Sequence, residues 1–147
     1  MLIADSGGVA PLVALLKSYS NPGAQETAAG ALSALADSED NRVRIAEAGG
    51  IKLLIILFEN GPGEAMDEVQ CALQTLVKGS VQNQLTVVTE AVAMLRNGSS
   101  QAQEHVTELL RNLSLDPDNR SAIAKAGAVP ELVRQLECGS DKAMGLA

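Results

Sequence analysis

The sequence has very few aromatic residues. They make up 1% of its 147 residues, as Tyr19 and Phe58, and tryptophan is absent. Hydrophobic residues nevertheless account for 46% of the chain, so a core must be built from leucine, isoleucine, valine and alanine. Such side chains suit the close packing of one helix on another. The length is enough for one ordinary domain with its own core.

Basic residues are also in short supply. Lysine and arginine number 11 against 18 acidic residues, which gives a net charge of −7. This balance disfavours nucleic acids and anionic membranes as partners, and it mildly favours a basic partner. No apolar run approaches the ~20 residues of a membrane span. The N-terminal sequence MLIADSGG lacks the basic start and long apolar stretch of a signal peptide.

Cysteine occurs twice, as Cys71 and Cys138, and this spacing fits no metal or redox motif. Two isolated thiols indicate a reducing compartment, so we expect a cytoplasmic or nuclear protein without a metal or other cofactor. The acidic neighbours Asp67 and Glu68 oppose the formation of a thiolate at Cys71.

Residues that could support catalysis are equally scarce. His105 is the only histidine, and no nucleophile or carboxylate stands at a recognisable catalytic spacing from it. Gly61-Pro62-Gly63 lacks the lysine of a phosphate-binding loop and does not follow a strand. We therefore expect no enzyme.

No run alternates between apolar and polar residues, so we predict no strand. What the sequence does contain is a repeated unit, seen best in NRVRIAEAGGIKLLIILF (41–58). Its shape returns in IADSGGVAPLVALL (3–16) and NRSAIAKAGAVPELVRQL (119–136). Gly7 and Gly49 stand about 40 residues apart, and Gly127 follows after about twice that distance, which is typical of stacked helical repeats.

Each repeat reads as a short helix, a glycine turn, a second helix, a loop and a longer third helix, for about eleven helices in all. The expected helices of the first, second and fourth repeats are Leu2–Asp5, 9–18, 22–36, a helix from Ser38 or Asp40 to Ala46, 51–58, a third helix ending near Lys78, 116–124 and 129–136. Glycine suits the turns because it adopts left-handed backbone conformations easily.

The third repeat has no glycine between Val81 and Arg96, so we predict one nearly continuous helix there. Its expected apolar stripe is Leu85, Val88, Val92 and Leu95.

Local signals mark the helix ends. Asn21 is a good N-cap before Pro22, and Ser100 with Gln103 is typical of a capping box. Cys138-Gly139-Ser140 predicts a break after the last apolar stripe.

The pattern NxxxIAxAGGIxxLxxLL, followed by a break and a helix ending in ALxxL, resembles the armadillo repeat. The resemblance covers essentially the whole chain, and AGGIKLL and LLRNLSLDPDNRSAIAKAGAVPELVRQL carry it most clearly. It implies an all-α fold, a right-handed α-solenoid of stacked three-helix repeats. We expect a single domain over 1–147 with about three and a half repeats: 1–37, 38–79, 80–115 and an incomplete 116–147.

The resemblance also implies that the third helices line a concave groove that binds an extended peptide of a partner. Aligning ALSAL, ALQTL and LLRNL places Ala34, Thr75 and Asn112 where peptide-binding relatives typically carry asparagine. The position four residues earlier, often tryptophan in nuclear-import receptors, holds Gly30, Cys71 and Glu108. Both features of an import receptor are therefore largely missing.

A different set of polar residues appears one turn further back. The same alignment superposes Glu26, Asp67 and Glu104, which would place carboxylates at one level of the groove, with Lys78 and Arg111 nearer its other edge. Alternatively, these acids are ordinary residues near helix N-termini, where the helix dipole favours them.

We thus expect a non-enzymatic scaffold for protein–protein interaction that binds a basic extended peptide. The alternatives are a structural, self-associating module, or a fragment of a larger protein such as the substrate-binding arm of a ubiquitin ligase. Two apolar stripes lack a covering repeat, and they favour a fragment that forms a homodimer: Leu2, Ile3, Val9 and Leu12 near the start, and Val129, Leu132, Val133 and Leu136 near the end.

Overall fold

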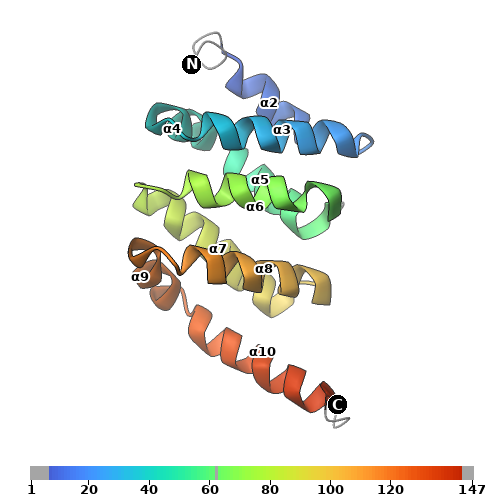
Figure 1. Ribbon diagram of the computed structural model, residues 1–147, viewed down its shortest axis with the longest axis vertical. Helices are drawn as coiled ribbons and strands as arrows, with labels where there is room; N and C mark the ends of the chain where they lie inside the picture. The colour runs from blue at the N-terminus through green and yellow to red at the C-terminus, as the bar shows by residue number, and fades with distance from the viewer. Residues whose placement is uncertain (1–6, 62, 144–147) are drawn as a thin grey trace. The chain divides into compact units, whose positions relative to one another are not determined.

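A computed structural model describes residues 7–61 and 63–143, and within them it contains nine α-helices, one short 3-10 helix and no strand (Figure 1). The helix expected at Leu2–Asp5 lies outside the described residues. The elements are α2 (Val9–Leu15), α3 (Pro22–Leu35), α4 (Glu39–Glu47), α5 (Gly50–Asn60), η1 (Gly63–Ala65), α6 (Met66–Leu76), α7 (Val81–Asn97), α8 (Ser100–Leu113), α9 (Pro117–Lys125) and α10 (Ala128–Ala143).

The chain forms two compact units, Met1–Val87 and Val88–Ala147, called here the first and second compact units. Their boundary falls inside α7. The first contains α2 to α6 and the first turns of α7, and the second contains the rest of α7 with α8, α9 and α10.

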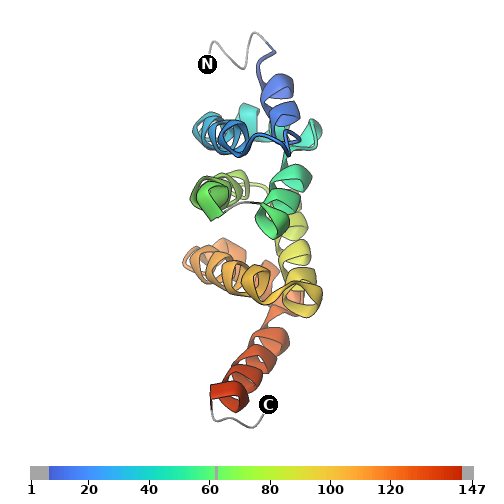
Figure 2. The same cartoon turned by 90° about the vertical axis from the view of Figure 1, so that its right-hand side faces the viewer.

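In the first compact unit, the third helices of two successive repeats, α3 and α6, lie side by side in one layer, while α2 and α5 lie in a second layer (Figures 1 and 2). The apolar side chains of the core between the layers are aliphatic apart from Phe58, as the composition predicts. Its fully buried members include Leu32, Leu54, Leu73 and Leu76. This arrangement leaves the outer faces of α3 and α6 toward solvent.

The repeated glycines take the left-handed conformation that the sequence predicts. The φ angles of Gly7, Gly49 and Gly127 are 77°, 79° and 78°. Gly79 also has a positive φ, of 70°, although the repeat pattern does not predict it. It stands between α6 and α7, so the third repeat places its left-handed glycine before its first helix instead of after it. In this region φ is strained for any residue that carries a Cβ atom.

The predicted continuity of the third repeat is confirmed, because α7 runs without interruption from Val81 to Asn97. Val88, Val92 and Leu95 are buried as expected. The assignment of Leu85 to the same buried stripe is wrong, because this residue is 39% exposed. Val87 is buried instead, which shows that the inward face of α7 is turned relative to the predicted stripe.

The cap at Asn21 is confirmed, since its Oδ1 accepts a hydrogen bond from the backbone N–H of Ala24 at 3.0 Å. The capping box assigned to Ser100 and Gln103 is wrong. The N-cap is Ser99, whose Oγ accepts from the N–H of Ala102 at 3.1 Å. The amide of Gln103 turns away and donates to a carbonyl at the end of α7.

The predicted break at Cys138-Gly139-Ser140 is also wrong, because α10 continues through these residues to Ala143. A glycine inside a helix costs only about 1 kcal/mol relative to alanine. At Gly61, where α5 does end, Pro62 follows and disfavours helical backbone in the residue before it. No proline follows Gly139. The separate last helix of the expected eleven therefore does not form in the described residues.

A buried asparagine in three repeats ties the first helix of the repeat to the third helix before it. The Nδ2 groups of Asn41, Asn83 and Asn119 donate to the carbonyl oxygens of Leu35, Leu76 and Leu113, at 2.9, 2.8 and 3.1 Å. These carbonyls stand at helix C-termini, where the i to i+4 ladder ends. Those of Leu35 and Leu113 also accept from the backbone N–H groups of Ser38 and Asp116, each at 3.2 Å. The polar residue that opens each repeat thus fixes how consecutive helices join.

Candidate functional site

The outer faces of α3 and α6 form the candidate binding surface of the first compact unit. Of the residues that the sequence assigns to the groove there, Glu26, Ala34, Asp67 and Cys71 are exposed, and Gly30 is half-buried. They are exposed because the inward positions of both helices are taken by small or aliphatic residues that face the second layer. On each helix the assigned residues stand four positions apart, so they share one face of that helix. Their use as a common binding surface remains a prediction.

Thr75, the sixth residue assigned to the groove in this unit, differs from the other five in its burial. It is buried, and its hydroxyl donates to the carbonyl oxygen of Cys71 at 3.0 Å, one turn earlier in α6. This internal hydrogen bond uses the only proton of the hydroxyl.

Glu68, which the sequence analysis did not assign to the surface, reaches across from α6 to α3. A Cβ atom added to Gly30 would stand 3.1 Å from the Glu68 Oε2 atom, so the glycine makes room for this carboxylate. The sequence signal was present in the small residue at position 30, but only the packing of α3 on α6 shows which side chain fills the space.

The surface of α3 and α6 carries one sign of charge. Glu26, Asp67 and Glu68 supply carboxylates, and neither Pro22–Leu35 nor Met66–Leu76 contains a lysine or arginine. Lys78 lies past the end of α6 and lines a separate hollow of about 260 Å³ near α4, together with Glu39, Arg42 and Glu47. Lys78 therefore lines a hollow other than the surface of α3 and α6, and its place at the other edge of a peptide groove remains a prediction.

In the second compact unit, Glu104, Glu108 and Arg111 are exposed on α8, and Asn112 is half-buried. Arg111 stands 3.6 Å from Glu108, in an i,i+3 pair whose side chains are 72% and 56% exposed. An exposed pair of this kind contributes only about 0–1 kcal/mol. Alignment of Glu104 with the carboxylates of the first compact unit remains a prediction.

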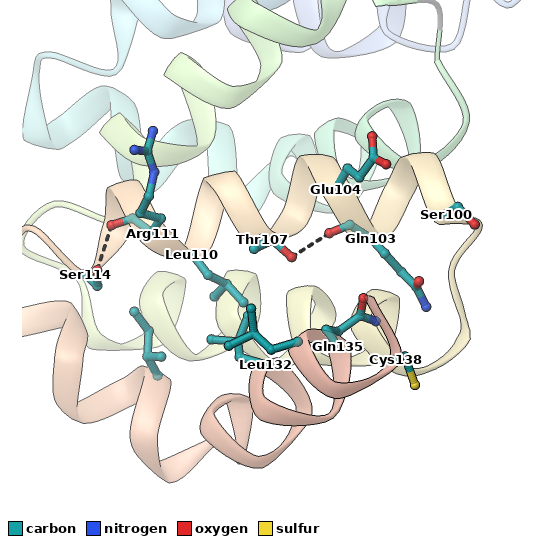
Figure 3. Close-up of a pocket in the computed structure, with 12 residues that line it drawn as sticks. Ser100, Gln103, Glu104, Thr107, Leu110, Arg111, Ser114, Leu132, Gln135 and Cys138 are labelled. Carbon is teal, nitrogen blue, oxygen red and sulfur yellow. Dashed lines mark hydrogen bonds between the residues drawn. The ribbon is translucent and has the colours of Figure 1, made fainter. Parts of the chain in front are cut away.

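A groove of about 870 Å³ lies between α8 and α10 (Figure 3). Leu110, Ile123, Leu132 and Leu136 give it an apolar floor and wall, while Glu104 and Arg111 belong to its lining on α8. The repeat pattern did not predict this groove.

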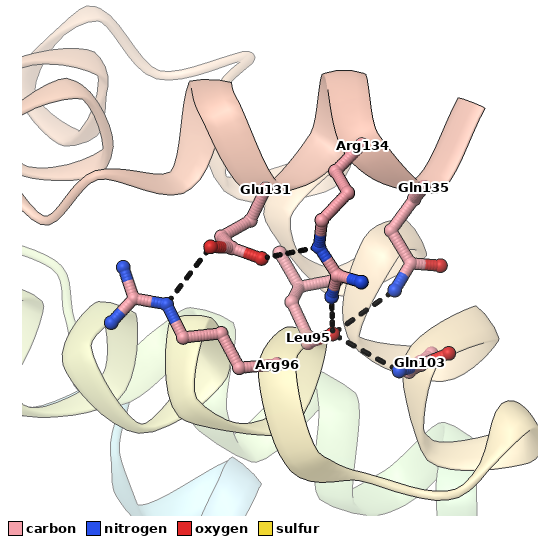
Figure 4. Close-up of polar contacts among 6 residues, drawn as sticks. All are labelled: Leu95, Arg96, Gln103, Glu131, Arg134 and Gln135. Atoms are coloured by element: carbon pink, nitrogen blue, oxygen red, sulfur yellow. Dashed lines mark hydrogen bonds and ion pairs between the residues drawn. The ribbon is translucent and has the colours of Figure 1, made fainter. Parts of the chain in front are cut away.

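Polar contacts hold α10 to the end of α7 (Figure 4). Arg134 Nη2 and Gln135 Nε2 donate to the carbonyl oxygen of Leu95 at 3.3 and 3.0 Å, as does Gln103 Nε2 at 3.0 Å. Glu131 accepts from the Nε atoms of Arg96 and Arg134, each at 3.0 Å. Hydrogen bonds from Arg96 and then Arg134 hold the pKa of Glu131 below its ordinary value.

Few residues of the described ranges could perform chemistry. Cys71 and Cys138 are unpaired, exposed thiols, and His105 is half-buried in α8. Across 7–61 and 63–143, no three histidine, cysteine or acidic side chains gather as metal ligands would. In the same ranges, no helix has the length and apolar character needed to cross a membrane.

Comparison with known proteins finds similar sequences and similar folds. The family model described as "Armadillo/beta-catenin-like repeat" matches residues 1–37. Over 147 residues the chain is 24% identical to U-box domain-containing protein 8 of Arabidopsis thaliana. The alignment covers 97% of this chain and 39% of that protein, so the chain spans well under half of its relative's length.

Three crystal structures of engineered proteins from the Northeast Structural Genomics Consortium have a similar fold. One is 30% identical in sequence, with a TM-score of 0.66, and the alignment covers 91% of this chain and 34% of the engineered chain. Another is 27% identical with a TM-score of 0.62, and the alignment covers 86% of this chain and 53% of the engineered chain. The third, 22% identical with a TM-score of 0.64 and covering 90% and 57%, supports the fold alone.

Together with the glycine turns and helix order, these matches confirm the all-α, armadillo-type α-solenoid fold and the resemblance of the chain to the armadillo-repeat family.

Proposed function

We propose that the chain is a non-enzymatic scaffold for protein–protein interaction that binds a basic, extended peptide segment of a partner on the outer faces of its third helices. One observation carries the proposal: α3 and α6 lie side by side and expose Glu26 and Asp67, with Glu68 between the helices and no lysine or arginine on either one. A surface of one charge attracts partners of the opposite charge.

The spacing of packed helices suits such a peptide. Adjacent helices generally lie ~8–10 Å apart, and an extended chain advances ~3.3 Å per residue. A lysine or arginine at about every third residue would therefore meet one acidic helix after another. Each exposed contact is worth about 0–1 kcal/mol, so several are needed for affinity. Because solvent-exposed charges are screened by ions, binding should weaken steeply as salt is added.

The proposal is tested by fluorescence anisotropy with a labelled peptide that has lysine at every third residue. Glu26→Lys combined with Asp67→Lys should weaken binding about tenfold, which corresponds to a loss of 1.4 kcal/mol. The matched control is Glu59→Lys with Glu90→Lys, which changes net charge equally at exposed positions on α5 and α7. If the two double variants lose affinity equally, the peptide senses only net charge and the proposed surface is wrong.

Two alternatives make different predictions. A self-associating module should gain mass across a tenfold range of concentration in light scattering, whereas a peptide-binding scaffold should keep a constant mass. A substrate-binding arm of a ubiquitin ligase fits the similarity to a U-box domain-containing protein and would use the same surface. In either case the unpaired Cys71 and Cys138 fit a reducing compartment, the cytoplasm or nucleus.

A further inference from the structure

The segment between α6 and α7, called here the α6–α7 link (residues 77–80), is one residue longer than its two counterparts. Asn83 lies seven residues after the leucine whose carbonyl it contacts, whereas Asn41 and Asn119 lie six residues after theirs. The longer link contains Gly79, the left-handed glycine that the repeat pattern does not predict. The hollow of about 260 Å³ lies between this link and α4, within the first compact unit.

Charged side chains of both signs line the hollow. Glu39, Arg42 and Glu47 come from α4, and Lys78 comes from the α6–α7 link. Among the described residues, none of these four side chains forms an ion pair, and only Arg42 makes hydrogen bonds. The hollow therefore presents two cations and two carboxylates that the described part of the chain leaves without a charged partner.

Arg42 has a fixed position at the wall of the hollow. It is half-buried, and its Nη1 atom donates to the carbonyl oxygens of Ala36 and Asp37 at 2.9 and 3.2 Å. Its Nη2 atom lies near Gly79, because a Cβ atom added to that glycine would stand 3.8 Å from it. Nη2 and Nε make no hydrogen bond within the described ranges. These N–H groups can thus bind a carboxylate, and charge-assisted hydrogen bonds of this kind are among the stronger polar contacts.

The two acidic residues restrict the ligand that the hollow can take. Glu39 stands three residues before Arg42 and would repel a ligand that carries negative charge alone, such as phosphate. Glu47 stands five residues after Arg42, roughly 7.5 Å along the helix axis. Lysine carries its cation on a flexible four-carbon stem. A single residue with a free α-carboxylate and a long cationic side chain can therefore reach Arg42 and Glu47 together.

The size of the hollow favours one residue over a longer ligand. Pockets for drug-sized ligands measure roughly 300–1,000 Å³, and this hollow, at about 260 Å³, is smaller. A lysine or arginine at the C-terminus of a protein supplies both charges within one residue. Free lysine or arginine shares this chemistry, so the experiment must separate a chain end from a free amino acid.

We infer that the hollow between α4 and the α6–α7 link binds the C-terminal residue of a partner protein that ends in lysine or arginine. The α-carboxylate of that residue contacts Arg42 and Lys78, and its side-chain cation contacts Glu47. Capture of a chain end through its terminal charge is one of the recurring modes of peptide recognition. This site is independent of the proposed function, which concerns an internal extended segment on the outer faces of α3 and α6.

The test is an NMR titration of the full, isotope-labelled chain with short acetylated peptides. One peptide ends in lysine with a free carboxylate, the second is its C-terminal amide, and the third ends in alanine with a free carboxylate. The first should shift the amide signals of Gly79 and Ser80 in a saturable way, because both residues line the hollow. The other two should have a Kd at least about fivefold higher. Free lysine should bind no more tightly than the first peptide, and tighter binding would overturn the assignment to a chain end.

Two variants remove one charge each from the hollow. Lys78→Gln should raise the Kd of the first peptide about fivefold, and Glu47→Gln should abolish the preference for lysine over alanine. Lys52→Gln and Glu59→Gln are the matched controls, because they remove the same charges from exposed positions on α5 that do not line the hollow. Each control should change Kd less than about twofold. Circular dichroism checks that the helix content of every variant is unchanged.

The proposed site is wrong if no peptide gives a saturable shift, if the carboxylate and amide forms bind equally, or if Lys78→Gln has no more effect than Lys52→Gln. It is also wrong if Glu26→Lys with Asp67→Lys abolishes binding of the first peptide, because the peptide would then lie on the surface of α3 and α6. Unchanged binding in that double variant supports the hollow, whatever the variant does to the peptide with lysine at every third residue.

Discussion

At the scale of single residues, the buried asparagines explain why three repeats carry the same polar residue near their start. Asn41, Asn83 and Asn119 are 5%, 7% and 4% exposed, and each donates to the carbonyl of a leucine at the end of the preceding third helix. No buried side-chain nitrogen or oxygen in the described ranges lacks a hydrogen-bond partner. The asparagines thus stabilise the junction between the third helix of one repeat and the first helix of the next.

We predict that Asn83→Ala lowers the free energy of unfolding by about 1–3 kcal/mol, because the buried Leu76 carbonyl loses the amide donor of Asn83. Asn119→Ala should cost less, about 0.5–1.5 kcal/mol, because the Leu113 carbonyl keeps the backbone N–H of Asp116 at 3.2 Å. Asn60→Ala is the control: its amide makes only an exposed contact of 3.4 Å with the Ile56 carbonyl, so the loss should stay within about 0.5 kcal/mol. Urea titration followed by circular dichroism measures both effects. Equal losses for the buried and exposed asparagines would refute the structural role.

At the scale of elements, α10 is attached mainly through polar contacts, unlike α5. Its outer apolar stripe is exposed, while Glu131, Arg134 and Gln135 contact Leu95 and Arg96 of α7. Three donors converge on the Leu95 carbonyl, which has two lone pairs. The stability of this helix should therefore depend on charge more than that of its counterpart.

We predict that acid loosens α10. The pKa of Glu131 is lowered by its arginine partners, so its ionised form stabilises the folded state above 4.5, the ordinary value, and that contribution is lost as pH falls through the lowered pKa. A pH titration of the Glu131 carboxyl carbon, followed by NMR, should have its midpoint below pH 4.5. Arg96→Met should raise that midpoint, because it removes the hydrogen bond that lowers the pKa. Arg120→Met should not, because Arg120 contacts the Ser114 carbonyl instead. An unchanged midpoint in Arg96→Met would contradict the attachment.

At the scale of the whole molecule, the chain divides into two compact units at a boundary inside the continuous helix α7. In repeat proteins, stability is approximately a sum of terms for each repeat and for contacts between neighbours. Local destabilisation is therefore expected to fade with distance along the chain.

We predict that Leu73→Ala, at a fully buried position of α6, destabilises the first compact unit by about 2–5 kcal/mol. Hydrogen exchange measured by mass spectrometry should show faster exchange throughout α3, α5 and α6, with a smaller change in α8 and α9. Leu115→Ala, at an exposed position, should leave the pattern unaltered. A uniform increase from α2 to α10 would show that residues 1–147 open as one cooperative domain, as the sequence analysis expects.

The sequence by itself determined the features that depend on neighbouring residues. Gly7, Gly49 and Gly127 set the turns because a left-handed backbone favours glycine, and the glycine-free stretch Val81–Arg96 predicted the continuous α7. The exposure of the α10 stripe was also foreseen, but Val9, expected to lack cover near the start, is 5% exposed.

Only the tertiary structure decided which side chains of a helix meet another part of the chain. It buried Thr75, exposed Leu85, placed Glu68 against Gly30 and opened the groove between α8 and α10. A helical period fixes the angular positions of residues on a helix, but burial depends on which neighbours cover each face. Those neighbours come from segments distant in sequence, so local patterns do not encode their contacts directly.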